Sequence, residues 1–156
     1  MRRIRAVALD VDGVLTDGTF LWGPDGQEFK RFSFLDVMGV SLGTKAGLVF
    51  ALISGEDSPL VDRFAAKMAI RHVYKDCKDK GQALHAFSAS AQVPLAAIAF
   101  MGDDVNDFPA MALAGLSATP ASAREEVRAR AGFVASRNGG DGAVRELVEH
   151  VLGGTR

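Results

Sequence analysis

Cysteine and net charge are both scarce in this sequence. Cys77 is the single cysteine among 156 residues, which excludes an internal disulfide and a metal site built on cysteines. The 18 lysines and arginines nearly balance the 19 aspartates and glutamates, so the formal net charge is -1. A chain with so little net charge has no general field to attract nucleic acid or an anionic membrane. We therefore expect a small-molecule partner that a few local residues recognise.

Long hydrophobic runs are lacking as well. No apolar stretch approaches the roughly 18 residues that a membrane-spanning helix needs, and no charged segment followed by a long apolar one opens the chain. We therefore expect no membrane segment and a cytoplasmic protein. With 48% hydrophobic and 24% charged residues, the chain can bury a sizeable core, and we expect one globular domain over residues 1–156.

Short apolar runs alternate with helical patterns along the chain. The first apolar run begins at residue 6 and ends at Asp10. Further strands are predicted at 48–53, 72–74, 96–101, 116–118 and 133–135. Helices are predicted at 36–45, around 61–68, and at about 81–90, 108–113, 122–131 and 143–152. This alternation is typical of an α/β fold with a doubly wound, Rossmann-like parallel sheet and helices on both faces.

A β-hairpin is predicted between the first strand and the first helix. The turn signal is the run from Gly23 to Gly26, which reads Gly-Pro-Asp-Gly, and aromatic residues stand on both flanks at Phe20, Trp22, Phe29 and Phe32. Because an isolated hairpin is marginal in water, we expect this one to pack on its own domain or on another subunit.

Two carboxylates and a glycine follow the first strand. With the period of two of an extended chain, Asp10 and Asp12 project to the same side. Neither has a basic neighbour in sequence, so the pair favours a cation, most simply Mg²⁺. Gly13 would let the backbone turn tightly and approach a ligand. A solvated Asp-Gly turn is the alternative if this motif is taken alone.

Polar residues also follow the next two strands. Ser54 and Gly55 offer a hydroxyl and a backbone N–H to an anion, although an ordinary helix cap made by Asp57 or Ser58 explains the same segment. Lys78 and Lys80 stand at a strand-to-helix junction; either both are solvated surface charges, or one of them balances phosphate charge.

An acidic cluster follows the strand predicted at 96–101. Asp103 leaves the strand first and is the natural metal ligand. Asp104 and Asp107 either hold groups around the metal or cap the helix at 108–113.

Together these motifs resemble the haloacid dehalogenase superfamily of phosphatases. The four motifs of that family match Asp10-x-Asp12-Gly13, Ser54-Gly55, Lys80 and Gly102-Asp103-Asp104-x-x-Asp107. The early hairpin, the lack of a separate cap domain and the segment from Gly139 to Glu146 look like the small tetrameric subfamily that dephosphorylates 3-deoxy-2-keto sugar acids. The resemblance covers essentially the whole chain.

The resemblance implies a Mg²⁺-dependent phosphomonoester hydrolase. Asp10 would form an aspartyl phosphate, and Asp12 would act as general acid and then general base. The metal would be held by Asp10, Asp103 and the backbone carbonyl of Asp12, while Ser54 and Lys80 would hold the phosphoryl oxygens. The resemblance also implies a homotetramer with hairpins packed between subunits and a mobile segment at 139–142.

The residue after the Ser54-Gly55 pair departs from the pattern of octulosonate phosphatases. Those enzymes typically carry an arginine there, which can fork onto a sugar-acid carboxylate, whereas this chain has Glu56. Glu56 with Lys67 looks like the pairing in relatives that act on 2-keto-3-deoxynononate 9-phosphate. We therefore predict a preference for this nine-carbon ester over 3-deoxy-D-manno-octulosonate 8-phosphate. Alternatively, both residues are ordinary surface residues.

Two rival functions follow from the same fold class. A signalling receiver domain also has an acidic pocket, but its acidic pair should be adjacent on the first strand, and here the motif is Asp10-x-Asp12. A non-catalytic tetramerisation module should have lost the nucleophile or the lysine, and Asp10 and Lys80 are both present. The phosphatase is the better interpretation.

Overall fold

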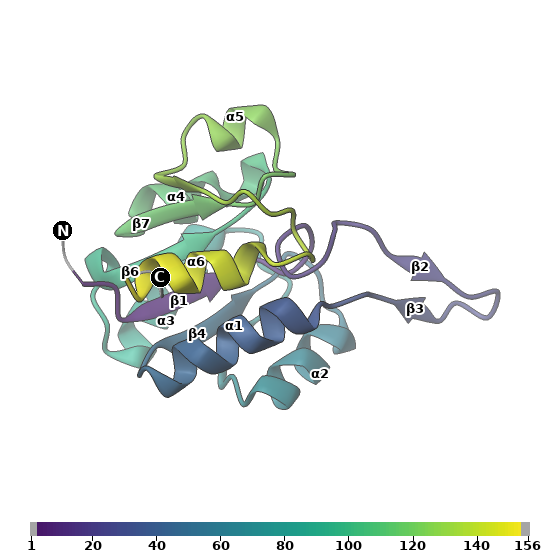
Figure 1. The fold of residues 1–156 in the computed structure, drawn as a ribbon. Helices are drawn as coiled ribbons and strands as arrows, with labels where there is room; N and C mark the ends of the chain where they lie inside the picture. Colours follow the sequence, from purple (N-terminus) through teal and green to yellow (C-terminus); the bar gives the residue numbers. More distant parts are fainter. Residues whose placement is uncertain (1–2, 154–156) are drawn as a thin grey trace.

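A six-stranded parallel sheet forms the centre of the molecule (Figure 1). The structure is a computed structural model that describes residues 3–153. The strands are β5 (His72–Tyr74), β4 (Val49–Ile53), β1 (Ala6–Leu9), β6 (Ile98–Met101), β7 (Leu116–Thr119) and β8 (Phe133–Val134), in that spatial order. β1 lies in the middle and pairs with β4 and β6 in parallel, with Ala6 opposite Val49 and Ile98. The carboxyl ends of these three strands therefore meet at one edge of the sheet.

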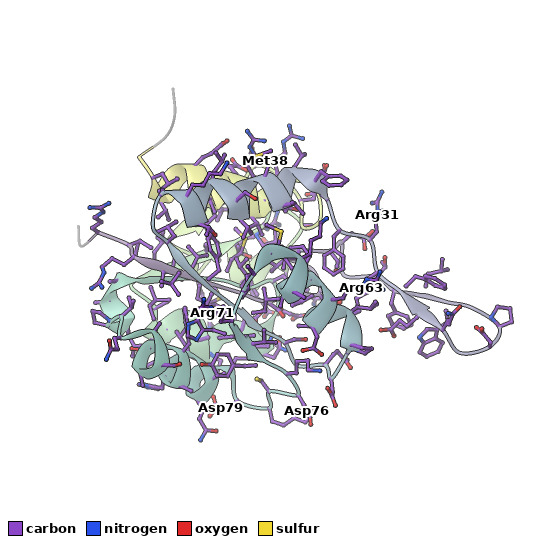
Figure 2. All side chains as sticks on the ribbon, turned by 90° about the horizontal axis from the view of Figure 1, so that it is seen from below. Arg31, Met38, Arg63, Arg71, Asp76 and Asp79 are labelled. Carbon is purple, nitrogen blue, oxygen red and sulfur yellow. The ribbon has the colours of Figure 1, made fainter. Side chains whose placement is uncertain are left out.

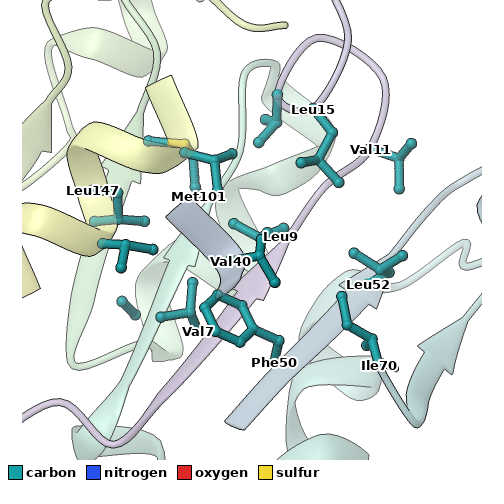
Figure 3. Packing of buried hydrophobic residues seen from close by; sticks show 14 of the residues in the cluster. Val7, Leu9, Val11, Leu15, Val40, Phe50, Leu52, Ile70, Met101 and Leu147 are labelled. Atoms are coloured by element: carbon teal, nitrogen blue, oxygen red, sulfur yellow. The ribbon is translucent and has the colours of Figure 1, made fainter. Parts of the chain in front are cut away.

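Helices cover both faces of the sheet, as the alternation predicts. They are α1 (Phe34–Lys45), α2 (Pro59–Met68), α3 (Lys80–Ala91), α4 (Phe108–Leu113), α5 (Glu125–Arg128) and α6 (Ala143–Val151). Successive side chains of β1 alternate between two buried cores: Val7 and Leu9 belong to one, and Ala6 and Ala8 to the other. Figure 3 shows Val7 and Leu9 in the first core, together with residues of β4, β6, α1 and α6. The doubly wound α/β fold is thus confirmed.

α1 and α6 lie side by side on one face of the sheet (Figure 1). Gly39 permits this close approach, because a Cβ at that position would lie 2.6 Å from the Cα of Arg145. Asp36 of α1 is buried and caps α6, since its carboxylate accepts the N–H of Val144 at 3.1 Å and that of Gly142 at 3.4 Å. Burial raises the pKa of Asp36 to about 6, although the N–H donors oppose the shift.

Most elements have the predicted bounds to within two residues. α1 begins at Phe34 because the Ser33 side chain accepts the N–H of Leu35. The strand predicted at 96–101 begins at Ile98, since Leu95–Ala97 form a 3₁₀ turn. The helix predicted at 122–131 is too long, since α5 is a single turn. Val127 is the only buried residue in α5, so packing against the body contributes little to stabilise a longer helix.

The hairpin consists of β2 (Leu21–Trp22) and β3 (Glu28–Phe29) and extends away from the sheet (Figure 1). Within this chain its aromatic side chains are largely exposed, with Trp22 at 65% and Phe20 at 56%. The connection that follows β1 contains this hairpin and no separate cap domain. Among residues 3–153, the longest helices fall short of the length and hydrophobicity that crossing a bilayer requires.

Candidate active site

The polar residues after β1, β4 and β6 lie next to one another at the carboxyl edge of the sheet. The backbone stays tied to the sheet there, since Asp10 N–H donates to the Met101 carbonyl at 3.0 Å and Ser54 N–H donates to the Tyr74 carbonyl at 2.8 Å. A cleft of about 470 Å³ opens at this edge. It is lined by Asp10, Asp12, Gly18, Gly55, Glu56, Cys77, Lys78, Lys80, Asp103, Asp104 and Asn106. This is the crevice in which open α/β sheets bind ligands.

Three carboxylates form a compact cluster in this cleft. One oxygen from each of Asp10, Asp103 and Asp107 lies within 4.8 Å of the others. Gly13 makes the arrangement possible: its φ is +85°, and a Cβ there would lie 1.9 Å from Oδ2 of Asp103. Clustered carboxylate oxygens are the ligands that a hard divalent cation such as Mg²⁺ prefers, so the donor set fits the metal expected from the sequence.

The cluster carries more negative charge than the protein compensates. Burial raises the pKa of Asp103 to about 6, and the charge of Asp107 adds to the effect. Burial and the same neighbour raise the pKa of Asp10 well above its ordinary value. One buried ammonium opposes them: Lys80 Nζ lies 3.0 Å from Asp10 Oδ1 and 2.7 Å from Asp107 Oδ1. Three carboxylates and one lysine leave negative charge that a divalent cation would compensate.

Lys80 is therefore no surface charge. Its side chain is 2% exposed. Burial favours the neutral amine, but the carboxylates of Asp10 and Asp107 outweigh that effect and raise the pKa of Lys80. Of the two interpretations that the sequence left open, the structure supports a lysine that balances charge inside the cleft.

Asp107 serves one of the two roles that the sequence offered as alternatives: it holds groups around the carboxylate cluster, and its side chain does not cap α4. Its Oδ2 accepts the N–H of Asp103 at 2.8 Å and that of Asp104 at 3.2 Å, while its Oδ1 binds Lys80. Asp104 caps the 3₁₀ turn Val105–Asp107. The side chain of Asp107 is fully buried and belongs to the carboxylate cluster, so it is closer to the candidate metal position than the sequence indicated.

Asp10 and Asp12 both line the cleft, as the sequence predicts, but the Asp12 carboxylate has a partner of its own. Its Oδ1 accepts a hydrogen bond from Lys30 Nζ at 2.6 Å, and Asp12 is not a member of the carboxylate cluster. Asp12 lies outside the strand, because β1 ends at Leu9 and the chain then turns, with the N–H groups of residues 14–16 donating to the Val11 carbonyl. Sequence analysis missed Lys30, which lies 18 residues further along the chain in the hairpin.

The residues after β4 separate into a cap and a cleft wall. Ser58 caps α2 by accepting the N–H of Leu60. Ser54 is buried, its Oγ accepts the N–H of Glu56 at 3.1 Å, and Gly55 and Glu56 line the cleft. The helix cap at Ser58 is therefore confirmed, and the binding of an anion by Ser54 and Gly55 stays a prediction.

Lys67 does not line the acidic cleft with Glu56. It lines a second hollow of about 670 Å³ between the hairpin and α2. Its Nζ lies 5.6 Å from the centroid of the Phe34 ring. Within one chain, Glu56 and Lys67 thus belong to different hollows.

Comparisons with known proteins identify the family. Residues 53–147 match the family model described as haloacid dehalogenase-like hydrolase. The chain is 36% identical to the 3-deoxy-D-manno-octulosonate 8-phosphate phosphatase KdsC of Yersinia pestis over 149 residues, which are 96% of this chain and 80% of the relative. It is 35% identical to KdsC of Escherichia coli K12, over 96% of this chain and 79% of that protein.

Solved structures give the same result. The octulosonate 8-phosphate phosphatase of Moraxella catarrhalis, in complex with a magnesium ion, a phosphate ion and KDO, has a TM-score of 0.92 and 34% identity, over 96% of this chain and 86% of that one. The cobalt-bound enzyme of Haemophilus influenzae has a TM-score of 0.93 and 34% identity, over 97% of this chain and 88% of that one. The resemblance seen in the sequence is confirmed, and this chain belongs to the haloacid dehalogenase-like hydrolases.

Proposed function

We propose that this protein is a Mg²⁺-dependent phosphomonoester hydrolase that acts on 3-deoxy-D-manno-octulosonate 8-phosphate. The observation that carries the proposal is the buried Asp10 beside Asp103, Asp107 and Lys80 in a polar cleft. The substrate is supported by the KdsC relatives and by the Moraxella catarrhalis enzyme, which holds magnesium, phosphate and KDO.

Asp10 is suited to be the nucleophile. Its Oδ1 accepts the N–H of Val11 at 2.7 Å and lies 3.0 Å from Lys80 Nζ, so Oδ2 is the oxygen that can attack phosphorus. A new bond forms between Asp10 and phosphorus while the ester oxygen departs with a proton from Asp12. A water then attacks the phosphorus, gives its proton to Asp12 and releases phosphate and the free Asp10 carboxylate.

The other residues of the cleft hold charge. Ser54, the backbone at Gly55 and Lys80 would bind the phosphoryl oxygens. Asp10, Asp103 and the backbone carbonyl of Asp12 would hold Mg²⁺, which when bound screens the phosphoryl charge from the attacking carboxylate. Asp107 would keep Lys80 and the Asp103 backbone in place, as its hydrogen bonds support.

The eight-carbon ester replaces the predicted nine-carbon ester as the principal substrate in this proposal. The Yersinia pestis and Escherichia coli relatives, at 36% and 35% identity, are both octulosonate phosphatases, and Lys67 does not line the cleft with Glu56. Glu56 itself does line the cleft, so it can still contact the sugar. The nine-carbon preference stays a prediction that competition between the two esters tests.

A homotetramer formed through the hairpins belongs to the same proposal. Phe20, Leu21 and Trp22 are each more than half exposed in the single chain, and association of copies would bury them. Light scattering should report a tetramer, and a monomer at micromolar concentration would contradict this part. A cytoplasmic location stays a prediction.

Phosphate release from a panel of esters tests the proposal. With Mg²⁺ we expect turnover of octulosonate 8-phosphate with a higher kcat/KM than for 2-keto-3-deoxynononate 9-phosphate, and no turnover in EDTA. A higher kcat/KM for the nine-carbon ester, shifted toward the eight-carbon ester by Glu56→Arg, would restore the original prediction. Failure to release phosphate from any ester would favour the non-catalytic module.

A further inference from the structure

We infer that Lys30 is a positioning residue, which holds the carboxylate of Asp12 where it can protonate the leaving group of the substrate. The inference rests on the proposed function and adds a residue of the hairpin to the catalytic arrangement. Its basis is the ion pair between Lys30 Nζ and Asp12 Oδ1, at 2.6 Å.

The ion pair is built into the fold and is unlike the other surface pairs. The side chain of Lys30 is 3% exposed and that of Asp12 is 32% exposed, so the ammonium is withdrawn from water while the carboxylate reaches the cleft. By contrast, the next residue, Arg31, lies 3.9 Å from Asp17 with a side chain that is 84% exposed. Figure 2 shows Arg31 where the hairpin joins the body. A lysine ammonium that is buried without a partner costs free energy, because it loses its hydration. The pairing with Asp12 offsets that cost.

Both residues of the pair lie on segments that other contacts hold in place. On one side, the turn after β1 is closed by hydrogen bonds from residues 14–16 to the Val11 carbonyl, and Gly13 N–H donates to Thr16 Oγ1. On the other side, Phe32 stacks on Phe64 of α2 with ring centroids 4.7 Å apart, which anchors the segment that follows β3 and carries Lys30. Among the described residues, Lys30 makes the only side-chain hydrogen bond found for the Asp12 carboxylate. Without Lys30, the backbone would keep its place and the carboxylate would be free to rotate.

The position of Asp12 matters for one step in particular. A sugar alkoxide is a poor leaving group, so cleavage of the ester bond needs a proton from a correctly placed acid. A 4-nitrophenolate departs without that help. kcat/KM covers the steps up to the first irreversible one, so it reports transfer to Asp10 and not the later hydrolysis that both esters share. A misplaced Asp12 should therefore lower kcat/KM for the sugar ester and spare the aryl ester.

The test compares Lys30→Met with the wild type on octulosonate 8-phosphate and 4-nitrophenyl phosphate, both with Mg²⁺. We expect kcat/KM to fall about 10-fold or more for the sugar ester and less than about 3-fold for the aryl ester. Lys30→Arg, which can donate to the same carboxylate, should recover part of the loss. Arg31→Met removes a neighbouring exposed charge and serves as the matched control.

The outcomes separate this inference from the proposed function. A wild-type enzyme that hydrolyses neither ester refutes the proposed function. A working wild type, together with equal losses on both esters or no loss on either, refutes the role of Lys30. If Lys30→Met unfolds, Lys30→Ala provides the same comparison because it also lacks a donor for Asp12, and the two-ester ratio is again the deciding measurement.

Discussion

Replacing Lys80 by methionine is the perturbation whose cost follows most directly from the structure. The lysine compensates two buried carboxylates at 3.0 and 2.7 Å, and its own side chain is 2% exposed. Removing one partner of a buried ion pair costs about 3–5 kcal/mol, since the remaining charge stays buried without compensation. Here Asp10 and Asp107 would both lose their cation. We expect Lys80→Met to lower the free energy of unfolding by about that amount in EDTA.

Urea unfolding followed by circular dichroism measures this loss. A matched control is Lys78→Met, because Lys78 pairs with Asp76 but its side chain is 85% exposed, and water screens such a pair so that it contributes little to stability. The double variant Lys80→Met/Asp107→Asn should be less destabilised than the sum of the two single variants, because it removes a carboxylate together with its ammonium. Mg²⁺ should reduce the loss in Lys80→Met. Two results would show that Lys80 does not compensate the buried carboxylates. One is a double variant whose loss of unfolding free energy equals the sum of the two single losses. The other is a loss in Lys80→Met no larger than in Lys78→Met.

Two further predictions concern the frame of the site. The raised pKa of Asp36, about 6 in the folded state, means that its protonated form contributes stability below about pH 4 that is lost as the pH rises through 6. Between pH 4 and pH 7 the free energy of unfolding of the wild type should therefore fall by up to about 3 kcal/mol relative to that of Asp36→Asn. A difference in unfolding free energy between the two proteins that stays constant across this range, as measured by urea unfolding, would contradict the prediction. Gly13→Ala would place a Cβ 1.9 Å from Asp103 Oδ2 at a φ of +85°, so we expect Mg²⁺-dependent phosphatase activity to fall by about 10-fold or more, whereas unchanged activity would show that the contact is not needed.

The sheet and the acidic cluster could be predicted because their signals are local. Apolar runs gave the strands, and the polar residues that end them, Asp10, Ser54 and Asp103, lie along one edge because parallel strands share their direction. The bounds of β5 and α4 agree with the prediction at both ends. In such segments the pattern, the turn residues and the packing all favour the same structure.

The partners that complete the site could not be predicted, since they come from distant parts of the chain. Lys30 is 18 residues from Asp12, and Asp36 caps a helix whose first residues are more than 100 positions away. In the sequence, Asp36 is an ordinary acidic residue near the start of a helix. Lys30 carried a weak signal, as a lysine that stands between the apolar residues Phe29 and Phe32. The separation of Lys67 from Glu56 also depends on how the hairpin and α2 pack, which no local pattern reports.

Phosphate release by wild type and Asp10→Asn tests whether Asp10 is the nucleophile. Both proteins would be assayed with octulosonate 8-phosphate and Mg²⁺, after their melting temperatures have shown that both are folded. The amide is isosteric but is a poor nucleophile, so we predict turnover by the wild type and a loss of about 10³-fold or more in the variant. Turnover by Asp10→Asn at the wild-type rate would contradict the aspartyl-phosphate mechanism.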